Sequence, residues 1–595
     1  MPATVISIDV VVGQIVAAGQ GLVVLESMKM EHVVVATSSG IVSTIAVSLG
    51  DTIAADALLV QLGDTDAIAQ TVLSDTKAVD GAKAVRADLA QVIERHEIGL
   101  DAARPDAVAK RVAKGQRTAR ENILDLLDAG TFIEYAPLVT AAQRRRRTAD
   151  ELRSQTPADG LVGGVGTVNG RRVVAISYDY MVLAGTQGLW NHFKKDRLFE
   201  LAERAELPVV LFAEGGGGRP GDTDGMGVSG LDCLAFNYFA RLSGVVPLVG
   251  IVSGYCFAGN AALLGCCDVV IATENSNIGM GGPAMIEGGG LGTFEPKEIG
   301  PAPVQVASGV IDVLVADEAD AVAVAKKYLE FFGKSTTEFS CVDQLELRDV
   351  IPESRTRAYD VHAVVDRLFD ANSVLELRAG FAQGMVTAIA RVEGNAIGVV
   401  ANNPMHLGGA IDSDGADKAA RFMQLCDAFG LPLIFLCDTP GFMVGPDSEA
   451  SGAVRHMSRL FVTGANLNVP VGTIVLRKGY GLGAQAMAAG SFKAPIFCVA
   501  WPTGEFGGMN LQGAVRLGMK RELDAIADDD ERAATFDTMV ERMYEVGKAV
   551  NVATHFEIDD VIDPADSRRW ITTLLCGDAS EAKRRGIRRA FIDTW

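Results

Sequence analysis

The sequence predicts a multidomain protein in which a small β-sandwich is followed by two tandem α/β domains. Three observations support this fold class. The first 63 residues contain a short repeat with an offset of 37 residues, and a long repeat with an offset of 224 begins near residue 160. Each copy of the long repeat alternates strand-type and helix-type apolar patterns, as α/β domains do. At roughly 150 residues per domain, 595 residues allow about four such segments.

Composition and charge exclude several classes of function. The 54 Lys and Arg residues against 75 Asp and Glu give a formal net charge of −21, which is unsuited to binding nucleic acid. No apolar run reaches the length of a membrane span, and residues 1–7 carry no secretory signal. The nine cysteines lack zinc-binding spacing. We therefore expect a reduced, cytoplasmic protein that binds neither nucleic acid nor membrane.

The predicted sandwich rests on alternating apolar stretches between residues 2 and 63. Residues 2–10 align with residues 39–47, and residues 13–16 align with residues 50–53 at the same offset. Two copies of one β-unit indicate a domain with pseudo-twofold symmetry.

One turn of this unit has the sequence Glu-Ser-Met-Lys-Met-Glu over residues 26–31, which places Lys29 at a hairpin tip. It resembles the biotin carboxyl carrier family, in which the modified lysine lies between two methionines. The resemblance implies a biotinyl domain over residues 1–63, with biotin attached to Lys29 by a biotin protein ligase and Met28 and Met30 beside it. The competing interpretation is a surface lysine between two core methionines.

Residues 64–105 are rich in Ala and Asp, which predicts a flexible linker followed by a helix within residues 82–98. Such a tether would let a carrier visit two active sites. Residues 106–135 then resemble the first helix of acyl-CoA carboxyltransferases. The basic run over residues 144–147 could attract CoA phosphates, although a solvated loop is the favoured interpretation.

The long repeat aligns residues 166–173 with 390–397 and residues 207–212 with 431–436. Helix-type segments occupy comparable places, over residues 193–205 and 417–429. Four glycine-rich stretches follow predicted strands, two in each copy: residues 211–219, 252–263, 437–442 and 477–487. Small residues at a strand-to-helix turn let a ligand approach the backbone and leave the first helix amides free to donate.

Both copies resemble the crotonase-type domains of the propionyl-CoA and acetyl-CoA carboxylase β-subunit family. The longest matches are residues 399–405, 438–442, 501–505 and 512–515. The resemblance implies a carboxyltransferase N-domain on the acyl-CoA side over residues 106–375 and a C-domain on the carboxybiotin side over residues 376–595. It also implies a homohexamer whose active sites are shared between subunits.

In that family, backbone amides form two oxyanion holes. The resemblance assigns catalytic positions to Ala258 and Gly259 for the thioester oxygen and to Leu482 and Gly483 for the biotin ureido oxygen. It implies that carboxybiotin releases CO₂ while its ureido nitrogen takes the α-proton of the acyl-CoA. Leu482 is larger than the residue usual in the family, but only its N–H is needed.

The position that helps select the acyl group in this family is occupied by Gln485, which fits neither usual apolar choice. Together with Leu482 and Phe257, Gln485 predicts a reshaped acyl pocket. We therefore expect an acyl-CoA substrate that is other than propionyl-CoA, or a broader range of acyl groups.

The predicted function is carboxyl transfer from carboxybiotin to the α-carbon of an acyl-CoA, with a separate ATP-dependent biotin carboxylase as partner. A transcarboxylase or decarboxylase would run the same half-reaction. A crotonase-type hydratase or isomerase needs a carboxylate, for which Glu214 is the candidate. A non-catalytic carrier or scaffold is a further alternative. The seven histidines share no motif and are interpreted as structural: His32, His96, His192, His362, His406, His456 and His555.

Overall fold

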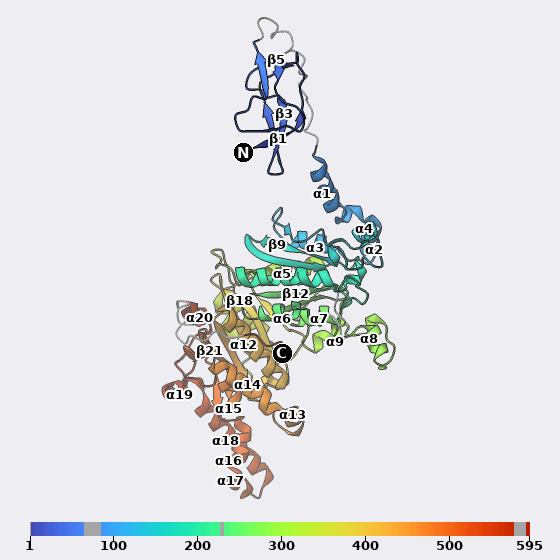
Figure 1. Ribbon diagram of the computed structural model, residues 1–595. Helices are drawn as coiled ribbons and strands as arrows, with labels where there is room; N and C mark the ends of the chain where they lie inside the picture. Colours follow the sequence, from blue (N-terminus) through green and yellow to red (C-terminus); the bar gives the residue numbers. More distant parts are fainter. Residues whose placement is uncertain (1, 65–84, 226–230, 576–590) are drawn as a thin grey trace. The chain divides into compact units, whose positions relative to one another are not determined.

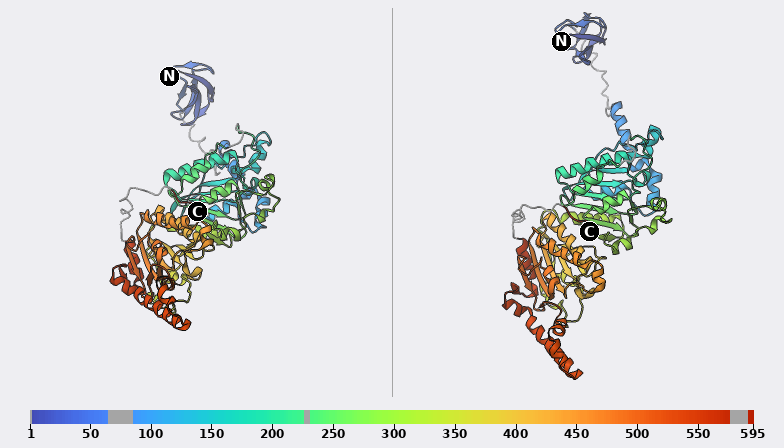
Figure 2. Two further views of the ribbon diagram at one scale, coloured as in Figure 1. Left: turned by 90° about the horizontal axis from the view of Figure 1, so that it is seen from below. Right: turned by 60° about the horizontal axis from the view of Figure 1, so that its bottom comes forward.

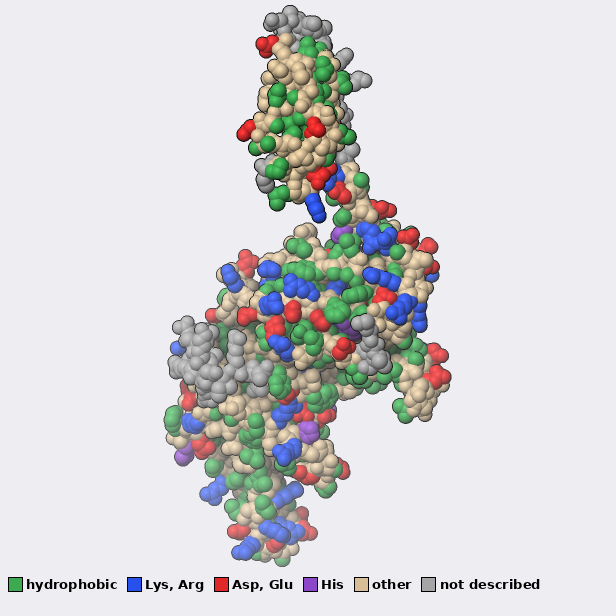
Figure 3. All heavy atoms as spheres, in the orientation of Figure 1, with side chains coloured by type: hydrophobic (Ala, Val, Ile, Leu, Met, Phe, Trp, Pro, Cys, Tyr) green, Lys and Arg blue, Asp and Glu red, His purple; other side chains and the backbone are tan. Residues whose placement is uncertain are grey.

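The computed structural model describes residues 2–64, 85–225, 231–575 and 591–595 (Figures 1 and 2). The chain divides into two compact units, residues 1–90 and residues 91–595, which are treated separately below. Basic and acidic side chains are interspersed on the face of the protein drawn in Figure 3. Within the described residues, no helix is long and apolar enough to cross a membrane.

The first unit consists of a four-stranded sheet in the order β4-β3-β1-β6 and a three-stranded sheet in the order β2-β5-β7. The strands are β1 (Ala3–Ile8), β2 (Ile15–Val16), β3 (Gly21–Ser27), β4 (Met30–Val35), β5 (Gly40–Ile45), β6 (Thr52–Ile53) and β7 (Val60–Gly63). Val5, Val23 and Val42 are among the buried residues of its core. β1 and β5 begin 37 residues apart and lie in opposite sheets. The same holds for β2 and β6, so the structure confirms the short repeat.

The predicted linker lies mostly at residues 65–84, which are outside the described residues. The helix predicted after it is present as α1 (Ala87–Glu97).

The second unit begins with a seven-stranded sheet in the order β16-β14-β12-β11-β10-β9-β8. Its strands are β8 (Ile133–Glu134), β9 (Leu161–Val168), β10 (Arg171–Tyr178), β11 (Val209–Phe212), β12 (Leu248–Val252), β14 (Val269–Thr273) and β16 (Val313–Val315). The strands from β10 to β16 run parallel, and β9 pairs antiparallel with β10. Helices α5 (Leu189–Ala205) and α6 (Ala235–Arg241) supply apolar residues to the core on one face.

A second sheet repeats this arrangement in the order β17-β18-β19-β20-β21-β22-β24, with β23 paired to β21. Its strands are β17 (Leu375–Leu377), β18 (Met385–Val392), β19 (Asn395–Asn402), β20 (Leu433–Thr439), β21 (Val471–Tyr480), β22 (Phe497–Ala500), β23 (Glu505–Gly507) and β24 (Asp560–Val561). β18, β19 and α12 (Ser413–Phe429) each lie 224 residues after β9, β10 and α5. The long repeat of the sequence is therefore a structural repeat.

The remaining helices connect these strands or extend beyond them. They are α2 (Pro105–Val112), α3 (Ala119–Leu126), α4 (Ala149–Gln155), α7 (Gly259–Gly265), α8 (Pro283–Gly288), α9 (Ala302–Ala307), α10 (Glu318–Glu330), α11 (His362–Leu368), α13 (Pro446–Ala450), α14 (Ala453–Ala465), α15 (Gly481–Ala486), α16 (Leu511–Gly518), α17 (Lys520–Asp524), α18 (Asp529–Gly547), α19 (Ala549–Thr554) and α20 (Ser567–Leu575).

The predicted division between residues 375 and 376 falls inside β17. Residues from the preceding segment, among them Leu347, Val364 and Phe369, are buried with strands of the second sheet. A division before residue 347 would keep this packing within one domain.

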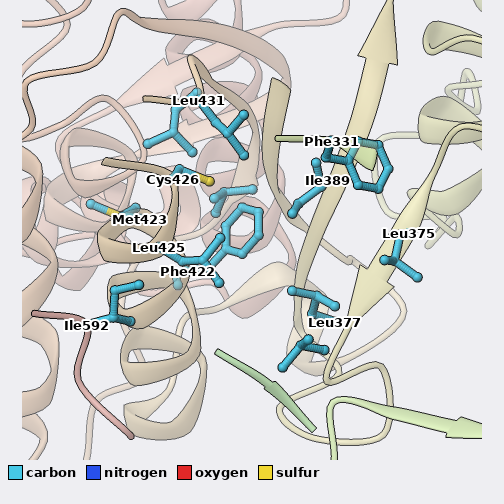
Figure 4. Close-up of a cluster of buried hydrophobic side chains, with 14 of the residues drawn as sticks. Phe331, Leu375, Leu377, Ile389, Phe422, Met423, Leu425, Cys426, Leu431 and Ile592 are labelled. Carbon is cyan, nitrogen blue, oxygen red and sulfur yellow. The ribbon is translucent and has the colours of Figure 1, made fainter. Parts of the chain in front are cut away.

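The two sheets share a continuous apolar core. A single cluster of buried side chains includes Val173 and Val210 of the first sheet and Ile389 and Phe435 of the second. Figure 4 shows part of it, where Phe422 and Cys426 of α12 lie near Ile389 of β18, and Ile592 lies below them. The repeats are therefore fixed against each other by apolar burial.

Glycines keep β8 close to β9. A Cβ on Gly164 of β9 would overlap the Ile133 carbonyl oxygen and lie 2.9 Å from Glu134 Cα. We predict that Gly164→Ala destabilises the protein by about 1–3 kcal/mol, because backbone atoms must move apart. Gly513→Ala is the control, since nothing lies within 4 Å of its Cβ position in α16. Thermal unfolding measures both variants, and equal midpoints would contradict the packing described here.

Candidate active site

The hairpin between β3 and β4 places Lys29 at its tip, where the side chain is exposed. Ser27 pairs with Met30, and the two residues between them have positive φ angles of 54° for Met28 and 64° for Lys29. Two such residues make the turn that matches the twist of a β-hairpin. Met28 is 78 % exposed and Met30 is 64 % exposed. These methionines are therefore not core residues, which contradicts the competing interpretation of this motif.

The first repeat places its glycine-rich turn between β13 (Tyr255–Phe257) and α7. Ala258 precedes the helix with a φ of 51°, a conformation that favours glycine. Its N–H donates to the Gly279 carbonyl at 3.0 Å, so this amide is already engaged. The Gly259 N–H has no acceptor among the described residues. Of the predicted pair, the Gly259 amide is thus the one free to bind an oxyanion.

The loop after β11 approaches this turn closely at Gly217. A Cβ at this position would lie 2.6 Å from the Ala258 Cβ and 3.6 Å from the Gly259 nitrogen. Gly217 also has a φ of 86°. Only glycine allows the loop to pass here without blocking the Gly259 amide. The sequence indicated the glycine-rich stretch but not which of its residues matters.

The second repeat builds the corresponding turn where β21 enters α15. Neither the Leu482 N–H nor the Gly483 N–H has an acceptor among the described residues. A Cβ on Gly483 would lie 2.7 Å from Cα of Gly441, the residue 224 positions after Gly217. The same close approach of loop and helix is therefore present in both repeats.

The two turns differ in conformation, although Ala258 and Leu482 are equivalent in sequence. Ala258 lies before its helix, whereas Leu482 is the second residue of α15 and its side chain is 60 % exposed. The second turn consequently offers two adjacent free amides.

An open pocket of about 620 Å³ lies beside the second turn. Leu482 lines it together with Gln485, one of the two residues that the sequence assigned to a substrate pocket. Its wall also includes His555, for which the sequence predicts a structural role, and apolar residues of distant segments: Phe492, Phe506, Val546 and Val552. Phe257 does not line this pocket, since it is buried against Gly279 and Gly282 in the first repeat.

Glu214 is held in an ion pair beneath the first turn. Arg111 binds both carboxylate oxygens, with Nη1 at 2.9 Å from Oε1 and Nη2 at 2.8 Å from Oε2. Burial raises the pKa of Glu214, while Arg111 opposes that shift. The equivalent residue Asp438 accepts from Arg477 at 3.1 Å. A carboxylate clamped in this way is poorly placed as the mobile acid or base of a hydratase.

Comparison with known families supports this description. The model of the carboxyl transferase domain matches residues 110–589, and the model of biotin-requiring enzymes matches residues 1–62. The chain belongs to the carboxyl transferase family.

Relatives within this family have defined activities. The chain is 34 % identical over 484 residues to the methylmalonyl-CoA carboxyltransferase 12S subunit of Propionibacterium freudenreichii subsp. shermanii, covering 79 % of this chain and 90 % of that one. It is 33 % identical over 509 residues to the propionyl-CoA carboxylase beta chain of Saccharopolyspora erythraea, covering 82 % and 92 %. These matches identify the chain as a carboxyltransferase of biotin-dependent acyl-CoA carboxylases with a biotin carrier domain.

The solved structures similar to this chain include two acyl-CoA-dependent carboxyl-transfer enzymes. A single-chain, multi-domain long-chain acyl-CoA carboxylase has 54 % identity and a TM-score of 0.79, over 96 % of this chain. The present chain spans 55 % of the length of that protein. The hexameric transcarboxylase 12S, with methylmalonyl-CoA and methylmalonic acid bound, has 32 % identity and a TM-score of 0.72, covering 83 % of this chain and 96 % of that one.

The position of Lys29 predicts a single site of biotinylation on this hairpin. After co-expression with a biotin protein ligase, we expect a biotin-sized mass increase in the wild type. We expect none in Lys29→Ala, because Lys29 is the single lysine of this hairpin, residues 21–35. Intact-mass spectrometry measures both. A mass increase that persists in Lys29→Ala would assign the biotin to another lysine.

Proposed function

We propose that this chain transfers a carboxyl group between biotin on Lys29 and the α-carbon of a long-chain acyl-CoA. One observation carries the proposal: two equivalent strand-to-helix turns each present a free backbone amide next to an obligatory glycine. Lys29 is exposed and pre-shaped in a hairpin, so it fits the attachment of biotin. Biotin, when bound, supplies the carboxyl group and accepts a proton.

The residues of the chain act through their backbone. We assign the Gly259 amide to the thioester oxygen and the amides of Leu482 and Gly483 to the ureido oxygen of biotin. Negative charge grows on both oxygens during transfer, and fixed donors stabilise it by about 3–4 kcal/mol each. Their orientation costs nothing at the moment of reaction because the helices hold them in place.

Two observations support a long acyl chain. The 54 % identical structure is that of a long-chain acyl-CoA carboxylase. In a site shared between subunits, the pocket beside Leu482 would face the acyl chain of an acyl-CoA bound at the Gly259 turn of another subunit. This pocket is open and has apolar side chains in its wall, so it has room for more than an ethyl group. We further propose a homohexamer with sites shared between subunits, by analogy with the hexameric 12S protein. An ATP-dependent biotin carboxylase would load the biotin.

A transcarboxylase would use the same turns with a different carboxyl donor, and the 12S relatives show that this activity exists in the family. The carrier fused to the transferase in one chain favours the carboxylase, since the fused solved structure is a carboxylase.

The first experiment is carboxylation of free biotin by carboxylated acyl-CoA thioesters of increasing chain length. We predict that kcat/KM is higher for a long-chain thioester than for methylmalonyl-CoA, because the longer chain buries more apolar surface in the pocket. A maximum at malonyl- or methylmalonyl-CoA would contradict the proposed substrate class, and no transfer with any of them would contradict the proposed function.

A second prediction tests the role of the first turn. Gly217→Ala places a methyl group against Ala258 and the Gly259 nitrogen, so we expect kcat for transfer to fall about 100-fold. Gly218→Ala is the matched control, because its Cβ position has nothing within 4 Å, and its kcat should stay within about twofold of wild type. Equal rates in the two variants would show that this turn does not bind the thioester.

A further inference from the structure

A lysine ammonium is buried beneath the first turn without a carboxylate partner. Lys195 of α5 is 0 % exposed, and its Nζ lies 2.6 Å from Gln187 Oε1 and 3.0 Å from the Tyr178 hydroxyl. In the described part of the chain, Lys195 forms no salt bridge. An unpaired buried charge is destabilising, so its presence calls for a function. Burial lowers the pKa of Lys195 to about 7.

A chain of hydrogen bonds leads from Lys195 to the proposed oxyanion turn. Gln187 Nε2 donates to Asn260 Oδ1 at 3.0 Å, and Asn260 is the second residue of α7. The same Asn260 oxygen accepts the Gly217 N–H at 3.1 Å, and the Gln187 N–H donates to the Gly217 carbonyl at 2.7 Å. A Cβ on Gly259 would lie 3.1 Å from Gln187 Nε2, so this chain of hydrogen bonds passes directly beside Gly259, whose amide is free.

The second repeat lacks this chain of polar groups. The residues 224 positions later are Asn402 for Tyr178, Ile411 for Gln187, Ala419 for Lys195 and Ala484 for Asn260. Three of these four replacements are apolar and all are buried. Since the glycine contact itself occurs in both repeats, the fold does not require the polar chain. It belongs to the turn that we assign to the thioester.

We propose that Lys195 is a positioning residue for the thioester side of the reaction. Its ammonium holds Gln187, Gln187 holds Asn260, and Asn260 fixes the Gly217 loop against the Gly259 amide. When Lys195 is protonated, this chain of hydrogen bonds also leads from a positive charge to the Gly259 turn, in surroundings where charge is weakly screened. This inference rests on the proposed function, because it assumes that the first turn binds the thioester.

The test replaces Lys195 by methionine, which has a similar length and no charge. The matched control is Lys194→Met, because Lys194 is buried beside it but donates to the Ala136 and Leu161 carbonyls instead. In carboxyl transfer to free biotin, we expect Lys195→Met to lower kcat about tenfold to a hundredfold, with little change in KM for the acyl-CoA. Lys194→Met should retain the wild-type kcat. An unchanged kcat in Lys195→Met, or an equal fall in both variants, would overturn the proposal.

Amide hydrogen exchange provides a readout that does not depend on activity. In Lys195→Met we expect faster exchange of the Gln187 and Gly217 N–H groups, which donate to the Gly217 carbonyl and to Asn260 Oδ1, and unchanged exchange of the Ile411 N–H, which donates to the Gly441 carbonyl in the second repeat. No change at Gln187 and Gly217 would overturn the positioning role even if the wild type proved inactive. A wild type without transferase activity whose exchange responds as expected would contradict the proposed function alone.

A double variant tests whether the lysine acts through glutamine. If it does, Lys195→Met combined with Gln187→Leu loses no more activity than the worse single variant, because both changes break one chain. Additive losses would show that Lys195 acts independently of Gln187.

Discussion

The close contact between a glycine-bearing loop and the start of a helix is the constraint on which both candidate sites depend. In the first repeat a Cβ on Gly217 of the loop would lie 2.6 Å from the Ala258 Cβ, and in the second a Cβ on Gly483 of the helix would lie 2.7 Å from Cα of Gly441 in the loop. The first amides of a helix have no acceptor within the helix, and here the loops border them without covering them. A protein that uses backbone amides as its catalytic donors must keep the loop and the helix this close at both turns, whereas the side chains around the two turns can vary.

The two repeats share this frame but support it differently. In the first, the buried pair of Arg111 and Glu214 lies below the turn, and the chain from Lys195 through Gln187 lies beside it. In the second, Arg477 pairs with Asp438, and the positions that correspond to Lys195 and Gln187 are apolar. The apolar core that spans both sheets joins the repeats into one unit. The two repeats thus share one geometry, but each turn has its own electrostatic surroundings.

Much of the fold could be predicted from the sequence, because an internal repeat shows which segments occupy equivalent positions. The offsets of 37 and 224 residues predicted the paired strands, and the Met-Lys-Met turn predicted the exposed hairpin of Lys29. The engagement of the Ala258 amide could not be predicted, since it depends on the Gly279 carbonyl of a strand that follows it. Phe257 is buried against Gly279 and Gly282 and does not line the pocket of Gln485, and nothing in the sequence indicated these contacts between distant residues. The burial of Lys195 could not be predicted from the sequence, because a lone lysine in an amphipathic helix is usually solvated.

The most direct test of the central claim is an experimental structure of the biotinylated protein with an acyl-CoA analogue bound. The account predicts that the thioester oxygen lies within hydrogen-bond distance of the Gly259 nitrogen and that the ureido oxygen of biotin lies at the nitrogens of Leu482 and Gly483. A thioester bound at the Leu482 turn, or an acyl-CoA held away from both turns, would contradict it.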